Sequence, residues 1–142
     1  SVTQANESRA RAVAAGAAAL AGGAKGLVLR HGDDCPDSME AKLFAIDVVS
    51  QVYSETEGRI VLISSGAMDN GSDALDRIEA GASLVQISSL LLSEGPSSVR
   101  RIKNETAHGV TNRGHVLLQD AVGAAHRKKK KGKRKANPWK GK

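Results

Sequence analysis

Residues 59–86 read RIVLISSGAMDNGSDALDRIEAGASLVQ and predict a strand, a helix and a second strand in immediate succession. The apolar run at residues 59–63 is typical of a buried strand. Ser72 is a suitable N-cap for a helix over residues 73–80, and a glycine follows as its C-terminal stop. Residues 84–87 form the next apolar run. Because the connections are short, we expect a right-handed βαβ unit with parallel strands.

The same alternation continues on both sides of this unit. Residues 26–29 predict an earlier strand, which lies between an Ala- and Arg-rich helix over residues 7–20 and a helix over residues 38–57. After the third strand, a Gly-Pro pair opens a helix over residues 95–104, and a short helix is expected around residues 116–122. The sequence therefore predicts an α/β fold with about three parallel strands alternating with helices.

The length of 142 residues limits how large this α/β fold can be. A complete eight-stranded (β/α)8 barrel needs about 250 residues, so the chain is either a small open layer or a partial barrel of the TIM type. Parallel sheets are normally covered on both faces, and open edges attract other strands. We therefore expect neighbouring protein subunits to cover the open sheet edges.

The net charge of +6 is distributed unevenly along the chain. Residues 127–142 contain ten of the 21 basic side chains and none of the 15 acidic ones, so residues 1–126 are mildly acidic. A block of like charges does not collapse on itself. We expect an α/β body over residues 1–126 and an extended basic arm over residues 127–142.

The basic arm predicts a polyanionic partner, with RNA favoured because each lysine or arginine that reaches a phosphate releases a counterion. An anionic lipid surface and a merely solvated or targeting tail are the alternatives. The aromatic content of 2% argues against a stacking platform for single-stranded RNA. The candidate contact residues are Arg127, Lys128, Lys129, Lys130, Lys131, Lys133, Arg134, Lys135, Trp139, Lys140 and Lys142.

Several kinds of site are excluded by what the sequence contains. Cys35 is the single cysteine, so an internal disulfide and a multi-cysteine zinc site are not expected. The four histidines stand at no metal-binding spacing, and the acidic residues near position 35 do not have the spacing of a calcium loop. No apolar run reaches the roughly 18 residues of a membrane span, so we expect neither a membrane span nor a signal peptide. The absence of an initial Met predicts a processed or incompletely recorded N-terminus.

Particular motifs resemble the C-terminal end of dihydroorotate dehydrogenases, especially the membrane-associated mitochondrial class. The resemblance covers roughly residues 26–127 and is strongest over residues 45–105; the basic arm is not part of it. It implies the last three βα units of an FMN-binding (β/α)8 barrel. The motifs are AIDVV at 45–49, GRIVLI at 58–63, GSDALDRIEAGASLVQ at 71–86, GP at 95–96, RIKNE at 101–105 and AVGAAHR at 121–127.

The resemblance implies only a vestigial phosphate-binding site. The family binds the FMN phosphate with paired glycines after its seventh strand and with the turn after its eighth strand. Gly66 and Ala67 stand at the first position, so one glycine has become alanine, and Ser88 and Ser89 stand where the family usually has Tyr-Thr. An ordinary turn is the competing interpretation of these residues.

The resemblance also implies that catalytic residues are missing. The family's catalytic base, flavin-contacting lysine and orotate-binding asparagines lie on earlier strands. An Asn-Thr-Thr segment of the family is replaced by Arg-His-Gly-Asp at residues 30–33. We therefore expect no catalytic residue, no FMN and no metal.

These expectations lead to a non-catalytic accessory subunit of a large assembly in the mitochondrial matrix. The mitochondrial ribosome is favoured, with the basic arm on rRNA. An accessory subunit of a respiratory or ATP-synthase complex is the alternative, and one half of a split dihydroorotate dehydrogenase is a third hypothesis.

Overall fold

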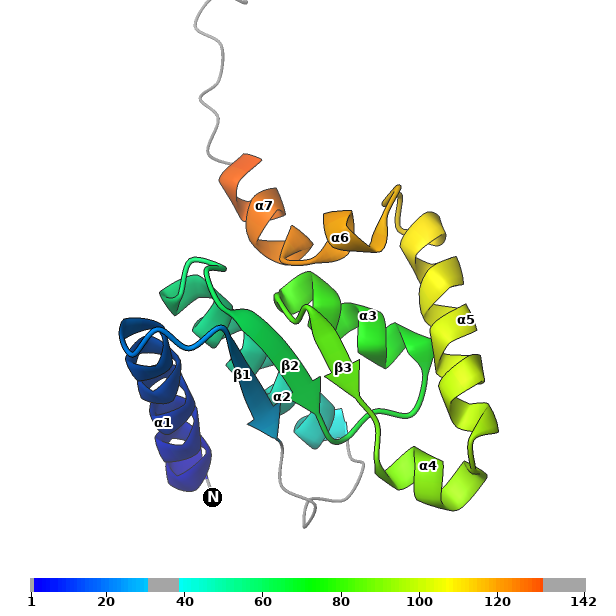
Figure 1. The fold of residues 1–142 in the computed structure, drawn as a ribbon, viewed down its shortest axis with the longest axis horizontal. Helices are drawn as coiled ribbons and strands as arrows, with labels where there is room; N and C mark the ends of the chain where they lie inside the picture. The colour runs from blue at the N-terminus through cyan, green and yellow to red at the C-terminus, as the bar shows by residue number, and fades with distance from the viewer. Residues whose placement is uncertain (1, 31–38, 132–142) are drawn as a thin grey trace, which may run out of the picture.

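The computed structural model describes residues 2–30 and 39–131 (Figure 1). Helices and strands alternate through most of this part of the chain, which confirms the predicted α/β fold. The elements are α1 Val2–Ala21, β1 Gly26–Arg30, α2 Met39–Glu55, β2 Val61–Ser65, α3 Gly71–Ala80, β3 Leu84–Gln86, α4 Ser89–Glu94, α5 Ser97–Asn112, α6 Leu118–Ala121 and α7 Ala124–Lys131. None of the described helices is long and apolar enough to cross a membrane.

The three strands form one parallel sheet in the order β1-β2-β3. Leu29 pairs with Ser64, and Ser64 pairs with Val85, so these side chains lie on the same face. Val28 and Leu84, each one residue away in its strand, therefore point to the opposite face.

One face of the sheet is covered by helices. Figure 1 shows α2 and α3 behind the sheet, with α1 beside β1 and α5 on the β3 side. Val49 and Val52 of α2 pack with Leu62 of β2 in the main core, and all three are almost fully buried. Gly16 lets α1 approach closely, because a Cβ there would lie 2.7 Å from Cγ1 of Val52.

The other face of the sheet is not covered by the described part of the chain. Val28, Val61 and Leu84 are 52%, 43% and 56% exposed, although parallel strands are normally buried on both faces. The expectation of an open sheet is therefore confirmed for the residues that the structure describes.

The start of α3 differs from the prediction. Asn70, rather than Ser72, is the N-cap, and its Oδ1 accepts a hydrogen bond of 2.9 Å from the backbone N–H of Asp73. The Ser72 hydroxyl instead accepts a hydrogen bond from Arg113. Asparagine and serine cap equally well, so tertiary contacts decide between them. The predicted stop at Gly81 is confirmed, with φ of 130°.

The segment after β3 contains more helix than the sequence predicted. The helix α4 was not expected, and α5 runs to Asn112 rather than residue 104. Ile102, Thr106 and Val110 are buried at intervals of four residues, which keeps the helix attached beyond its predicted end. Pro96 is the N-cap of α5 and not its first helical residue.

The prediction of an extended arm from residue 127 is wrong for its first five residues. The helix α7 runs from Ala124 to Lys131, because two alanines start the helix and the following arginine and lysines are good helix formers. The rest of the expected arm, residues 132–142, lies outside the described residues, as does Cys35.

Candidate functional site

Two turns with predicted site residues meet at one end of the sheet. Gly66 and Ala67 follow directly after β2, and Ser88 and Ser89 follow β3 within three residues. Because β2 and β3 pair in parallel, their carboxyl ends lie at the same edge. The structure thus brings the four predicted residues to one edge, which is where open α/β sheets bind ligands.

A buried arginine stabilises the turn after β2 by hydrogen bonds. The guanidinium of Arg77 donates to the carbonyl of Ala67 at 2.6 Å and to the hydroxyl of Ser64 at 3.1 Å. Arg77 is 1% exposed, and burial lowers the pKa of its guanidinium while the charge of Asp73 opposes this effect. Gly66 and Ala67 both have positive φ, 90° and 41°. The arginine therefore fixes a turn that an alanine adopts only with strain.

The sequence analysis did not identify Arg77 as a structural residue. It lies on α3 one position before Ile78 and three after Ala74, both of which are buried. An arginine within an apolar helical face is the signal that could have identified it.

The N-terminus of α3 is occupied by groups of its own chain. The backbone N–H of Gly71 donates to Oε2 of Glu105 at 2.7 Å, and this bond, together with Arg101, lowers the pKa of Glu105 against the effect of burial. Nζ of Lys42 lies 2.6 Å from Oδ2 of Asp69 and 2.8 Å from Oδ2 of Asp73. The positive end of this helix is therefore already matched by carboxylates and is not open to a phosphate.

The turn after β3 is more accessible. Ser88 and Ser89 are both exposed, and Ser88 is the N-cap of α4 without a side-chain capping bond. The helix α4 has six residues, too few for a strong dipole.

The described residues do not fit an intact FMN site. Ligand pockets typically bury most of the ligand surface, but the sheet face here is open, with Val28 and Leu84 more than half exposed. Ala67 is itself buried, and its carbonyl is engaged by Arg77. His31 and Cys35 lie outside the described residues, so the altered segment after β1 is described only at Arg30.

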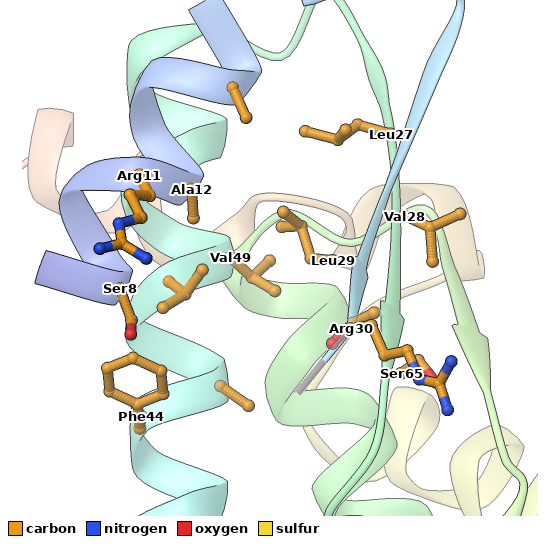
Figure 2. Close-up of a pocket in the computed structure, with 14 residues that line it drawn as sticks. Ser8, Arg11, Ala12, Leu27, Val28, Leu29, Arg30, Phe44, Val49 and Ser65 are labelled. Atoms are coloured by element: carbon orange, nitrogen blue, oxygen red, sulfur yellow. The ribbon is translucent and has the colours of Figure 1, made fainter. Parts of the chain in front are cut away.

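A cavity of about 450 Å³ runs along the free edge of β1 (Figure 2). Figure 2 shows Leu27 and Leu29 pointing from β1 toward α1 and α2, whereas Val28 points to the other side. Ala12 of α1 and Phe44 of α2 complete the wall, which is mainly apolar.

A second cavity, of about 590 Å³, runs along the free edge of β3. Leu84 and Val85 contribute one wall, and Val99, Ile102 and Val110 of α5 contribute the other. Both cavities therefore lie where a strand next to the sheet would run.

Two of the described histidines, His115 and His126, contact other residues of the chain, whereas His108 is exposed on α5. His115 lies 2.7 Å from Glu79, and Nε2 of His126 lies 2.9 Å from the carbonyl oxygen of Ala80, with its ring beside Tyr53. No group of three His, Cys, Asp or Glu side chains that could hold a metal occurs among the described residues.

Of the predicted polyanion contacts, Arg127 is the one whose side chain is described. It donates to the carbonyl oxygens of Val122 and Asp120. The lysines at 128–131 belong to α7, and residues 133–142 lie outside the described part of the chain.

Comparison with known proteins gives one consistent result. The family model described as dihydroorotate dehydrogenase matches residues 39–110, about half the chain. The dihydroorotate dehydrogenase (quinone) of Rhodospirillum rubrum is 40% identical over 106 residues, which are 75% of this chain and 26% of that protein. The mitochondrial dihydroorotate dehydrogenase (quinone) of Mus musculus is 40% identical over 80 residues, 56% of this chain and 20% of that protein.

The comparison of structures gives the same family as the comparison of sequences. The crystal structure of the Eimeria tenella dihydroorotate dehydrogenase in complex with ferulenol matches with a TM-score of 0.73 and 29% identity, over 84% of this chain and 36% of that one. The chain spans about a quarter of the length of the curated relatives it matches, both bacterial and mitochondrial. It therefore belongs to the dihydroorotate dehydrogenase family and forms part of that family's barrel.

Proposed function

We propose that this chain is a non-catalytic structural subunit of a larger mitochondrial assembly in which neighbouring protein covers its open sheet. The observation that carries the proposal is the uncovered sheet face, where Val28 and Leu84 are more than half exposed. Full burial of one such side chain contributes roughly 1.5–3 kcal/mol, so covering the face favours association.

The basic segment at residues 127–142 supplies the second contact of the proposed subunit. Its ten basic side chains favour binding to RNA phosphates. The RNA-containing mitochondrial assembly that we favour is the ribosome, with this segment on rRNA. The mitochondrial matrix location rests on the resemblance to the mitochondrial class of the family.

Fractionation of mitochondria tests this proposal. The chain is expected to sediment with a ribosomal subunit, to leave it after RNase treatment or in high salt, and to cross-link to rRNA through residues 128–135. Lysines lying more than roughly 8 Å, one Debye length, from any phosphate would contradict the RNA contact. Sedimentation with inner-membrane complexes and binding to cardiolipin vesicles would instead support the respiratory or ATP-synthase alternative.

One observation favours a second candidate, a split dihydroorotate dehydrogenase. The turn after β2 keeps two residues of positive φ, Gly66 and Ala67, at the same sheet edge as Ser88 and Ser89. This candidate requires stoichiometric FMN and orotate production in the purified complex. Absence of flavin absorbance in that complex would eliminate it.

A further inference from the structure

The basic helix α7 begins with a turn that is packed on the body of the molecule. The helix contacts α3 (Figure 1), and Ala124 at its start is 4% exposed. The backbone N–H of Gly123 donates to the carbonyl oxygen of Ile78 at 3.0 Å. A Cβ on Gly123 would lie 2.4 Å from the hydroxyl oxygen of Tyr53. The chain therefore enters α7 in direct contact with both α2 and α3.

His126 attaches the first turn of α7 to the end of α3. Its Nε2 lies 2.9 Å from the carbonyl oxygen of Ala80, the last residue of α3, and 3.4 Å from the hydroxyl oxygen of Ser50 on α2. The rings of His126 and Tyr53 have their centroids 4.9 Å apart. Because a carbonyl oxygen only accepts hydrogen bonds, Nε2 carries a proton in this contact. The imidazole thus satisfies a C-terminal carbonyl of α3 and joins α7 to two helices.

Arg127 joins the same turn to α6. Its two terminal guanidinium nitrogens donate to the carbonyl oxygens of Asp120 and Val122, at the C-terminal end of α6. The planar guanidinium reaches two oxygens in a fixed geometry, which the ammonium of a lysine does not reproduce. Arg127 was predicted as a polyanion contact, but in the structure it fixes the backbone that leads into α7.

The rest of α7 depends on this anchored turn. Residues 128–131 are four consecutive lysines, and like charges three or four residues apart destabilise a helix. Formation of the first turn is the costly step, and isolated helices shorter than about 12–15 residues are marginal in water, whereas α7 has eight residues. Once the first turn exists, the helix dipole favours cations at its C-terminal end. The contacts of His126 and Arg127 therefore supply the nucleus of the basic helix.

We propose that α7 is a preformed basic helix that binds the phosphates of double-stranded RNA, with His126 and Arg127 as its positioning residues. This inference rests on the proposed function, because it names the class of RNA and the residues that orient the contact. A helix of fixed orientation gains most from a ligand whose phosphates are also fixed, since neither partner must then be ordered on binding. An RNA duplex offers phosphates in a regular A-form geometry, whereas a single strand is flexible.

Two substitutions that keep the charge test the role of Arg127. Arg127→Lys cannot engage both carbonyl oxygens in the same way, whereas Lys128→Arg leaves the anchored turn unchanged. Each full-length variant is titrated with a mixed-sequence RNA duplex and with one of its single strands. We expect Arg127→Lys to weaken duplex binding at least about fivefold and single-strand binding less than about twofold. Lys128→Arg should bind both RNAs like the parent chain.

His126→Ala tests the second anchor, with His108→Ala at an exposed position on α5 as its control. We expect His126→Ala to weaken duplex binding at least about fivefold, because the first turn of α7 loses its contact with α3. The Cα NMR chemical shifts of residues 128–131 should lose their helical values in this variant. His108→Ala should keep both the duplex affinity and the helical shifts.

Three results would overturn the inference: no duplex binding by the parent chain, unchanged duplex affinity in Arg127→Lys and His126→Ala, or equal weakening of duplex and single-strand binding. Failure of the proposed function is seen separately in the fractionation of mitochondria. Duplex binding that depends on both anchors, in a chain that does not sediment with ribosomal subunits, would contradict the ribosomal proposal and support the positioned helix. Sedimentation with a ribosomal subunit that persists although the duplex is not bound would do the reverse.

Discussion

Arg77 shows how one buried charge fixes the turn at the candidate site. Its guanidinium donates to Ser64 and to the carbonyl of Ala67, and it is 1% exposed. Replacing Arg77 with Met leaves both acceptors without their donor, so we expect a loss of about 2–3 kcal/mol in the free energy of unfolding. Urea denaturation measures this change in the free energy of unfolding. The exposed Arg100→Met variant is the control, with a change within about 0.5 kcal/mol. Equal midpoints for the two variants would contradict the structural role of Arg77.

Tyr53 makes Gly81 sensitive to substitution. A Cβ on Gly81 would clash with Cβ, Cγ and Cδ2 of Tyr53, and φ at Gly81 is 130°. Gly95 also has positive φ, 76°, but a Cβ there meets nothing within 4 Å. We therefore expect Gly81→Ala to lower the melting temperature clearly more than Gly95→Ala, whose cost is the backbone strain of about 1 kcal/mol. Similar effects would show that Tyr53 can move aside.

Residue-level predictions from the sequence succeeded where local chemistry decides and failed where tertiary contacts decide. The stop at Gly81 follows from the chain's own backbone conformation. The N-cap of α3 depends on Arg113, which takes up the Ser72 hydroxyl, and on Glu105, which binds Gly71. Both partners lie more than thirty residues away, so the sequence alone could not choose Asn70.

The first turn of α3 depends on carboxylates that must be ionised. Burial raises the pKa of Asp73, but the hydrogen bonds from Lys42 and from backbone N–H groups outweigh it, so the pKa lies below the ordinary value of 3.8. A lowered folded-state pKa stabilises the fold above that value and stops doing so as the pH falls through the folded pKa. We expect the unfolding free energy to fall below about pH 4.

Asp73→Asn tests this source of acid sensitivity. The variant is expected to be less stable than the parent chain at pH 7 and to lose less stability on acidification. Thermal unfolding between pH 7 and pH 3 measures both changes. Glu55→Gln, at an exposed position in the last turn of α2, should follow the parent curve. An unchanged pH dependence in Asp73→Asn would show that this carboxylate does not contribute.

At the scale of elements, the three strands and the helices between them were predictable because their apolar periods are strong. The extent of α5 was not, because the predicted helix ended at residue 104 whereas the observed helix continues through Gly109, a poor helix former, to Asn112. In the structure, this glycine allows α5 to approach α3, because a Cβ there would lie 2.9 Å from Leu75. The glycine therefore serves close helix packing rather than helix termination.

At the scale of the whole molecule, the basic segment should give salt-dependent RNA binding. Replacing the four lysines at 128–131 with glutamine is expected to reduce the slope of log K against log salt by about 3, at roughly 0.7 per phosphate contact on a single strand. Filter binding at several salt concentrations measures the slope. The exposed Lys103→Gln variant of α5 should keep the parent slope, and an unchanged slope in the fourfold variant would exclude these lysines from the contact.

The sequence could predict that the sheet is open, because three strands cannot close a barrel. The positions of α1 and α5 at the sheet edges could not, since they depend on which helix packs on which strand. The candidate phosphate residues were placed at one edge by their order along the chain. The role of Arg77 beneath them became visible only in the packed structure.

Hydrogen exchange at the backbone amides of Val28 and Leu84 tests most directly whether another protein covers this sheet. The full chain is measured alone and within the proposed assembly. We predict rapid exchange at both amides in the isolated chain and strong protection in the assembly. Strong protection of both amides in the isolated monomer, or rapid exchange in the assembly, would contradict the account.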